Sequence, residues 1–327
     1  MSAPFRCLCI LSITFTGAIL SSQVHASCGT TACSINTDWN EHGINSPGWS
    51  TDLRYSYSRA DTLRSGSNKT HADPTANPYN TGIEAENQRT INQLLTATLD
   101  YTHDEHWGVM LQLPYVMREH THSIGDADPT LVATEKFTAN GFGDSKVVDR
   151  YRWDENMDAH SGVGIKFGFK IDTGGKDFRM NTGALPGEAT LQPGNGSTDV
   201  ILGAFWTQNT PGSMWSWFAQ GTLQNSVTSS ARFRPGNQQN IDAGTYYAFN
   251  NTVSGLLQIN AQWNDKDTGS AAALSSLTGE ASSGMKSIAL TPGASYAITP
   301  SSRLYILVQI PVYQYVNGEQ LTADYAY

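Results

Sequence analysis

Apolar and polar residues alternate along twelve short stretches of this chain. In one of them, Val163, Ile165 and Phe167 fall on one side, while Gly164 and Lys166 fall on the other. Successive side chains of a β-strand point to opposite faces, so this period predicts strands with one apolar and one polar face. The twelve expected strands are, to within a few residues, Thr51–Arg59, Thr90–Tyr101, Trp107–Arg118, Gly143–Trp153, Val163–Ile171, Asp199–Thr207, Trp215–Leu223, Ile241–Asn250, Ser254–Asn264, Lys286–Ile298, Arg303–Tyr313 and Gln320–Tyr327.

The connectors between these stretches are alternately long and short. Up-and-down barrels of the bacterial outer membrane have this rhythm, with long extracellular loops and tight periplasmic turns. Lipid offers no partner to backbone N–H and C=O groups, so strands can cross it only as a closed barrel. We therefore predict an all-β fold, a transmembrane antiparallel up-and-down β-barrel of about twelve strands over residues 51–327, with periplasmic N- and C-termini. The last strand, which ends on Tyr327, is expected to close the barrel against the first.

Aromatic residues gather near both ends of the expected strands. Trp107, Trp153 and Trp215 lie beside short turns, and Tyr115 and Phe169 lie toward the long connectors. Two aromatic girdles around an apolar band are typical of membrane barrels, because amphipathic rings favour both interfaces. The alternative is a soluble β-sandwich or lipocalin-like barrel, which would bury these rings in a core.

One strand fits the pattern poorly. In the stretch Gly143–Trp153 the lipid-facing side would include Asp149. A carboxylate facing the middle of a bilayer is costly, so we expect a bulge, a position near the rim or a local error in the register.

The first 26 residues have the features of a secretory signal peptide. The apolar run Cys7–Leu20 follows a single basic residue, Arg6, and leads to a small-residue cleavage pattern at 24–26. A retained anchor helix is the alternative, although the run is shorter than the roughly 20 residues that span a bilayer. Residues 27–50 would form a periplasmic segment, either a plug inside the barrel or an irregular lead.

Export affects how the cysteines are interpreted. Cys28 and Cys33 would be the two that remain after cleavage, and in an oxidising compartment we expect them to form one small disulfide loop. A metal pair and lipidation of Cys28 are the alternatives.

The formal net charge is −9, and loss of Arg6 would make it one unit more negative. This charge argues against nucleic acid as a partner, since neutralising phosphates needs a basic surface.

The polar faces of the expected strands carry charged residues of both signs. Inside a barrel such residues can pair across the lumen as struts or form a selectivity constriction. The candidates for lumen-lining positions are Asp52, Arg54, Asp100, Arg150, Arg152, Lys166, Lys170 and Arg303.

Two histidines suggest a different function. His120 and His122 are two residues apart in an extended segment, so their rings would share one face, an arrangement that suits a transition metal. Solvated loop histidines are the alternative. Some outer-membrane barrels are hydrolases, but the chain has no nucleophile-elbow pattern and no histidine in the last eight expected strands. We expect no enzyme activity and no cofactor.

Several segments resemble a family of outer-membrane transporters named after the meta-pathway of phenol degradation. The resemblance covers roughly residues 141–327, with a weaker similarity around the second and third strands. The family usually has Pro-Thr-Gly where this chain has Asp172-Thr173-Gly174, so the loop that follows should differ. The segments that carry the resemblance are Gly141–Asp144, Leu191–Asp199, Leu290–Gly293 and Ile310–Gly318.

The resemblance implies a passive outer-membrane channel for small solutes, including hydrophobic or aromatic ones. Its motifs are turn chemistry and supply no functional residues. The partners expected on this basis are outer-membrane lipid and a small-molecule solute, and the oligomeric state stays open. A component that handles metal ions, built on the histidines, is the alternative function, and a barrel hydrolase is a weaker one.

Overall fold

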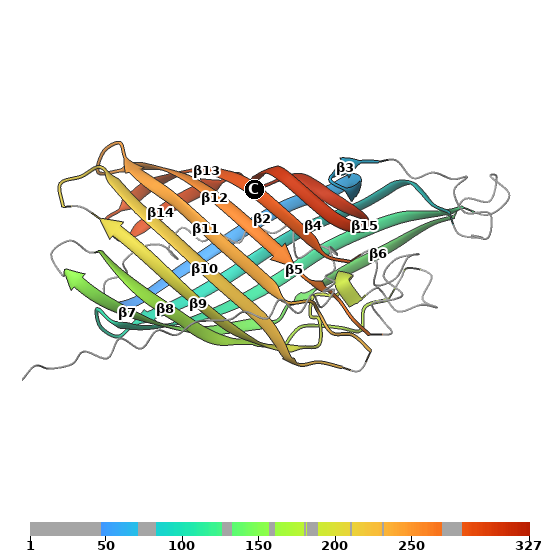
Figure 1. Cartoon of the computed structure of the whole chain (residues 1–327), viewed down its shortest axis with the longest axis horizontal. Coiled ribbons are helices and arrows are strands. Elements are labelled where there is room, and N and C mark those ends of the chain that lie inside the picture. The colour runs from blue at the N-terminus through green and yellow to red at the C-terminus, as the bar shows by residue number, and fades with distance from the viewer. Residues whose placement is uncertain are drawn as a thin grey trace, which may run out of the picture.

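The computed structural model describes residues 47–70, 83–125, 133–156, 161–179, 181, 189–209, 211–230, 232–269 and 283–327. The expected signal peptide and the Cys28–Cys33 loop lie outside these residues. The described part is an antiparallel β-barrel whose strands run obliquely to its long axis (Figure 1). Its strands are β2 (Gly48–Gly66), β3 (Asn68–Lys69), β4 (Ile83–Thr102), β5 (Trp107–Gly125), β6 (Ala133–Phe142), β7 (Ser145–Asn156), β8 (Ser161–Ile171), β9 (Thr198–Asn209), β10 (Trp215–Thr228), β11 (Gln238–Ala248), β12 (Val253–Asn264), β13 (Met285–Thr299), β14 (Ser302–Leu307) and β15 (Ile310–Ala326), with one short 3-10 helix, η3 (Ala189–Leu191).

Neighbouring strands pair around a closed ring. The order runs from β12 through β11, β10, β9, β8, β7, β5, β4, β2 and β15 to β13, and β13 pairs with β12 again. Among the described residues eleven elements form this ring, and β3, β6 and β14 are additional. The expected closed, antiparallel barrel is therefore confirmed.

The element β15 passes along the barrel twice. Its first part pairs with β13 and its last part pairs with β2. Between them lies the step Asn317-Gly318, where Gly318 has a φ of 62°, and Gln309 pairs back with Ala326. The left-handed φ explains the glycine at this tight connector. Counting both passes gives the twelve expected from the sequence.

The last residue lies on the first strand, as expected for a closing strand. The backbone N–H of Tyr57 donates to the carbonyl of Tyr327 at 2.6 Å, and the N–H of Tyr327 donates back at 3.0 Å. Their rings also stack, with centroids 5.2 Å apart.

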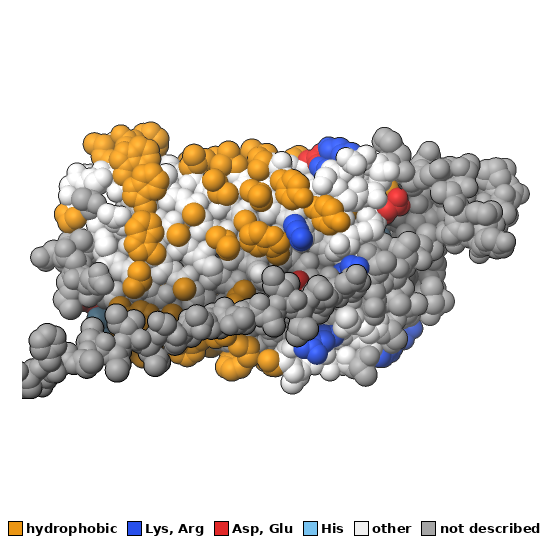
Figure 2. Space-filling model, in the orientation of Figure 1, with side chains coloured by type: hydrophobic (Ala, Val, Ile, Leu, Met, Phe, Trp, Pro, Cys, Tyr) orange, Lys and Arg blue, Asp and Glu red, His pale blue; other side chains and the backbone are white. Residues whose placement is uncertain are grey.

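The barrel reverses the usual arrangement of a soluble fold. Large apolar side chains are exposed on the outside, including Leu53 (70%), Ile259 (55%) and Leu304 (63%). The inward positions between them hold buried polar groups such as Gln258 and Thr322. Figure 2 shows apolar side chains over the barrel wall and charged ones gathered toward the end with the long connectors. This surface suits lipid outside and water inside.

Aromatic rings form a belt beside the short turns. Trp107 contacts Tyr151 with centroids 4.7 Å apart, Tyr151 contacts Trp153 at 4.8 Å, and Trp215 contacts Tyr247 at 4.6 Å. We call this end of the barrel the short-turn end and the opposite one the long-loop end. The girdle expected at the short turns is present.

Asp149 lies near that belt. The register of β7 against β8 is continuous from Ser145 to Trp153, so Asp149 faces outward without a bulge, opposite Phe167. It lies on β7, two residues before Tyr151, which belongs to the aromatic belt. Of the three explanations considered, a position near the rim fits best.

The expected fourth strand, Gly143–Trp153, corresponds to β7, and β6 precedes it where the sequence predicted a connector. β5 pairs with β7 near the short-turn end and with β6 farther along, and Gly143 and Asp144 lie between β6 and β7. A Cβ at Gly143 would lie 3.1 Å from Pro114 and from the carbonyl of Pro193. Glycine therefore allows the connector after β8 to approach the wall at this break.

Within the part of the chain that the structure describes, no helix has the length and apolar character needed to cross a bilayer.

Candidate functional site

The barrel encloses a cavity of about 280 Å³, near the lower end of the range of about 300–1,000 Å³ typical of small-molecule sites. Side chains from β2, β4, β5 and from β7 to β12 line it, together with residues of the connector between β8 and β9. Most of these side chains are polar or charged. Arg54, Lys166 and Lys170, three of the expected lumen residues, are among them.

The connector between β8 and β9 folds inward. Its residues Ala189, Thr190 and Gln192 line the cavity. The Arg118 guanidinium holds them: its Nη1 donates to the carbonyls of Thr190 at 3.3 Å and Leu191 at 2.8 Å, and also to that of Gln192 at 3.2 Å. The Nε of Arg118 donates to Asn92 at 2.7 Å, which fixes the side chain to β4. Charge-assisted hydrogen bonds of this kind are among the strongest available to a loop.

The same connector has an apolar contact with the wall. Leu191 is buried against Phe137 and Ala139 of β6, and Phe178 packs on the same cluster. The side chain of Gln192 also bonds to Phe178, accepting from its N–H at 3.1 Å and donating to its carbonyl at 2.9 Å. This segment of the connector is therefore packed against the wall and lines the cavity.

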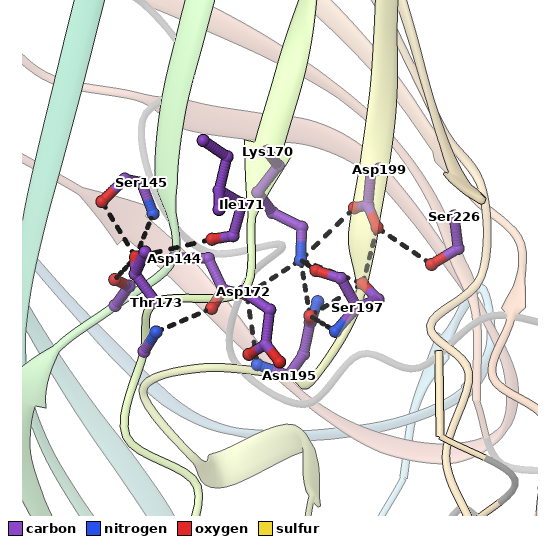
Figure 3. Close-up of polar contacts among 12 residues, drawn as sticks. Asp144, Ser145, Lys170, Ile171, Asp172, Thr173, Asn195, Ser197, Asp199 and Ser226 are labelled. Atoms are coloured by element: carbon purple, nitrogen blue, oxygen red, sulfur yellow. Dashed lines mark hydrogen bonds and ion pairs between the residues drawn. The ribbon is translucent and has the colours of Figure 1, made fainter. Parts of the chain in front are cut away.

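Lys170 is the centre of a buried ionic cluster at the root of this connector (Figure 3). Its Nζ donates to Asp144 at 2.8 Å, to Asn195 at 2.5 Å, and to the carbonyl and hydroxyl of Ser197 at 2.9 and 3.0 Å. A second carboxylate, Asp199, lies 3.5 Å away. The Lys170, Asp144 and Asp199 side chains are only 5–7% exposed.

The two carboxylates extend the cluster to the backbone and to β10. Asp144 accepts from the N–H of Gly174 at 3.0 Å and from that of Asn195 at 3.2 Å. Asp199 accepts from Gln224 at 2.6 Å and from Ser226 at 2.9 Å. A buried charge is tolerated only when it is paired and hydrogen-bonded, and each of these three charges satisfies that condition.

Two glycines let the ends of the connector meet. The N–H of Gly194 donates to the carbonyl of Gly175 at 2.9 Å. A Cβ on Gly174 would lie 2.5 Å from the backbone of Gly194, which no side chain would permit.

A second polar network begins on the same strand as Lys170 and runs along the inner wall. Lys166 donates to Gln220 at 2.8 Å, and Gln220 donates to Asp242 at 3.1 Å. Asn260 then donates to Asp242 at 2.6 Å and accepts from Thr291 at 2.6 Å. These hydrogen bonds link β8, β10, β11, β12 and β13 along the inner wall.

A third pair lies nearer the short-turn end. The guanidinium of Arg150 bonds both oxygens of Asp100, one at 2.8 Å, and also reaches Thr102. A Cβ on Gly108 would lie 2.4 Å from this guanidinium, so glycine on β5 lets Arg150 cross from β7 to β4. This pair acts as a strut along the wall.

The remaining candidates lie apart from the cavity lining. The hydroxyl of Tyr305 donates to the carboxylate of Asp52, whose two oxygens lie 3.1 and 2.9 Å from it. The inward face of β7 includes Arg152, and Arg303 is exposed beside the Pro300 turn. All three alternate with outward apolar neighbours, Leu53, Trp153 and Leu304, so they belong to the inner face of the wall, although none of them lines the cavity.

The two histidines of the metal hypothesis belong to β5. His120 is buried, and its Nδ1 lies 2.8 Å from the hydroxyl of Thr90. The side chain of His122 lies outside the described part of the chain, as do Cys28 and Cys33. Among the described side chains, no group of three His, Cys, Asp or Glu residues could hold a metal ion.

Two carboxylates outside the strands have shifted pKa values. Backbone N–H groups of Trp107 and His106 donate to Asp104 in a short turn and lower its pKa below the ordinary value of 3.8. At the long-loop end, burial raises the pKa of Asp265, with Asn237 and Lys286 opposing it.

Sequence reasoning missed most of the groups that hold the connector. Arg118, Asp144 and Asp199 are absent from the expected lumen set. Yet Asp144 and Asp199 end two of the segments that carry the family resemblance, and Gly174 ends the Asp172-Thr173-Gly174 segment where the chain departs from the family. The signal was therefore present as three polar and glycine-rich motifs at the same end of three consecutive strands.

No protein-family model matches the chain, and no curated protein matches it. Among solved structures, an outer membrane channel from Pseudomonas putida F1 matches with a TM-score of 0.59 and 12% sequence identity, covering 89% of this chain and 98% of that chain. A FadL homologue from Pseudomonas aeruginosa matches with a TM-score of 0.39 and 10% identity, covering 85% and 88%. The second likeness is too low to compare in detail. The first shows that this chain has the fold of an outer membrane channel.

Proposed function

We propose that this chain is a passive channel of the bacterial outer membrane that admits small solutes through a narrowed, polar lumen. The observation that carries this proposal is the combination of an apolar exterior with a polar cavity that the connector between β8 and β9 partly fills. A barrel with a lipid-facing surface and a lining of mixed charge is suited to selective diffusion rather than to catalysis.

Further support comes from the fold and from the resemblance. The matched Pseudomonas putida F1 structure is a channel. Two of the four segments that resemble the meta-pathway family, Gly141–Asp144 and Leu191–Asp199, meet at the Lys170 cluster, and this supports membership of this chain in that family. The proposal includes periplasmic termini, with the short turns on the periplasmic side and the long connectors outside.

Liposome swelling and planar bilayer recordings test the proposal. Protein purified from an outer membrane and reconstituted should give stepwise ion conductance, and it should let small sugars enter faster than oligosaccharides. Protein-free liposomes and protein unfolded by boiling are the controls. Absence of both conductance and solute entry, with correctly folded protein in the bilayer, would contradict a channel function.

A further inference from the structure

Three charged side chains meet on β4, β5 and β6, toward the long-loop end of the barrel. The carboxylate of Glu119 on β5 lies 2.9 Å from the ammonium of Lys136 on β6 and 3.5 Å from the guanidinium of Arg89 on β4. Arg89 pairs with Thr121, and Thr121 pairs with Lys136, so the two cations lie in one row of the sheet with a single strand between them. We call Arg89, Glu119 and Lys136 the outer charged cluster.

The outer charged cluster faces away from the lumen. Successive residues of a strand point to opposite faces of the wall. Glu119 lies between Arg118 and His120, which are both buried, and Lys136 precedes Phe137, which is fully buried. The side chains of the cluster themselves are 34–48% exposed. The cluster therefore lies on the outside of the barrel, separate from the cavity.

A pair of aromatic rings on the short-turn side of the cluster marks the edge of the apolar band. Tyr115 on β5 pairs with Phe142 on β6, their ring centroids are 5.3 Å apart, and Phe142 is 65% exposed. Exposed rings of this kind favour the interface between hydrocarbon and headgroups. Glu119 lies four residues beyond Tyr115, about 13 Å along a strand. Since the strands run obliquely (Figure 1), the cluster lies less than this distance above the rings, in the headgroup region.

The outer charged cluster carries more positive than negative charge. Among the described side chains, Arg89 and Lys136 share the one carboxylate of Glu119. Exposed ion pairs contribute little to stability, so this carboxylate yields readily to a stronger anion. A guanidinium binds a phosphate through two parallel hydrogen bonds, and an ammonium binds it as a point charge. The pair of cations is therefore suited to one phosphate group held between them.

We propose that the outer charged cluster binds a phosphate group of lipopolysaccharide in the outer leaflet of the membrane, between Arg89 and Lys136. Lipopolysaccharide forms the outer leaflet of a Gram-negative outer membrane, and it carries phosphates just outside its acyl chains. Clusters of Lys and Arg beside a bilayer recognise such anionic headgroups. The proposal rests on the proposed orientation, with the long connectors outside the cell, and is independent of what passes through the lumen.

Native mass spectrometry of the barrel in detergent tests this site. Rough lipopolysaccharide should bind more tightly than the same lipopolysaccharide after phosphatase treatment, and more tightly than phosphatidylglycerol. Arg89→Gln and Lys136→Gln should each lower the affinity about fivefold, the effect of one basic residue near an anionic surface. Glu119→Gln, which removes the competing carboxylate, should raise the affinity, and this gain cannot arise from misfolding.

A balanced ion pair on β2 provides the matched control. Arg59 lies 2.6 Å from Asp61, and both side chains are exposed. The double substitution Arg59→Gln and Asp61→Asn removes one charge of each sign and should leave the affinity for lipopolysaccharide unchanged. The mobility of unboiled protein on gels shows whether each variant is folded.

Three results would overturn the proposal. The first is equal binding of lipopolysaccharide before and after phosphatase treatment, or binding that is indifferent to the combined Arg89→Gln and Lys136→Gln substitutions. The second is a preference for phosphatidylglycerol, which would also contradict the proposed orientation. The third is a dimer that these substitutions dissociate, because a second copy of the chain would then cover this face. Absence of conductance would overturn the channel function and leave the lipid site intact.

Discussion

At the scale of the residue, the buried charges of this barrel are held by partners from separate segments. Lys170 lies one residue before the end of β8, Asp144 directly precedes β7, and Asp199 is the second residue of β9. Removing one member leaves the others buried without compensation, whereas removing all of them leaves only polar amides.

The first prediction concerns this balance. Lys170→Met leaves two buried carboxylates and should lower the free energy of unfolding by about 3–5 kcal/mol. Adding Asp144→Asn and Asp199→Asn to that variant should recover most of the loss. The exposed lysine Lys176, which pairs with Asp172, is the control, and Lys176→Met should cost about 0–1 kcal/mol. Urea unfolding in lipid vesicles, followed by tryptophan fluorescence, measures these differences. If Lys170→Met and Lys176→Met lowered the free energy of unfolding by the same amount, the burial assigned to Lys170 would be contradicted.

A second residue-scale prediction uses pH. The pKa of Asp104 is lowered by backbone N–H donors in the turn after β4. A depressed pKa in the folded state means that this carboxylate stabilises the fold above its ordinary value of 3.8 and stops doing so as pH falls through the lower folded value.

Asp104→Ala should therefore lower the unfolding temperature at pH 7, and its difference from wild type should shrink below about pH 3.8. Asp104→Asn keeps one acceptor oxygen, so its unfolding temperature at pH 7 should lie between those of Asp104→Ala and the wild type. The mobility shift of the folded barrel on unboiled gels gives the unfolding temperature. A difference that grows in acid would show that the turn is held by other contacts.

At the scale of the element, the alternation of apolar and polar residues predicted which side chains face outward wherever one face of a strand meets lipid. The outward residues of β8, from Val163 to Ile171, were assigned correctly, and so was the partner of the last strand. The expected ends of several strands were wrong. β2 continues to Gly66 and β5 to Gly125, well beyond the expected ends. Beyond the bilayer both faces of a strand are wet, so the apolar period disappears while the hydrogen-bonded ladder continues.

The inward fold of the connector between β8 and β9 could not be read from periodicity. Its anchors come from Arg118 on β5 and from Asp144 between β6 and β7, far away in sequence. Arg118 looked like an ordinary strand end, because its role depends on three carbonyls that only the folded connector brings to it. The alternation of apolar and polar residues therefore predicted the strands of the barrel wall. The position of the connector depends on contacts between residues far apart in sequence, which the alternation does not report.

The third prediction tests that constriction. Arg118→Ala removes charged hydrogen bonds worth about 1.5–3 kcal/mol each, so the connector should leave the lumen more often. Conductance in planar bilayers should rise, and larger sugars should enter liposomes. Arg89→Ala is the matched control, because Arg89 is a half-exposed arginine on β4 paired with Glu119. An unchanged conductance and size limit in Arg118→Ala would mean that the connector does not limit passage.

At the scale of the whole molecule, the account depends on which face of the wall meets lipid and which meets water. Neighbouring residues on one strand should differ completely in this respect. On β10, Thr222 lines the cavity while Leu223 is 48% exposed on the outside. On β11, Asn240 lines the cavity and Ile241 is 53% exposed on the outside.

The most direct measurement is thiol labelling at these four positions. Single cysteines at 222, 223, 240 and 241, in a background without native cysteines, would be reconstituted in lipid vesicles. A charged, membrane-impermeant maleimide should label positions 222 and 240, and a lipid-soluble maleimide should label 223 and 241. Equal labelling of all four positions, or the reverse order, would contradict a barrel with lipid outside and a hydrated lumen.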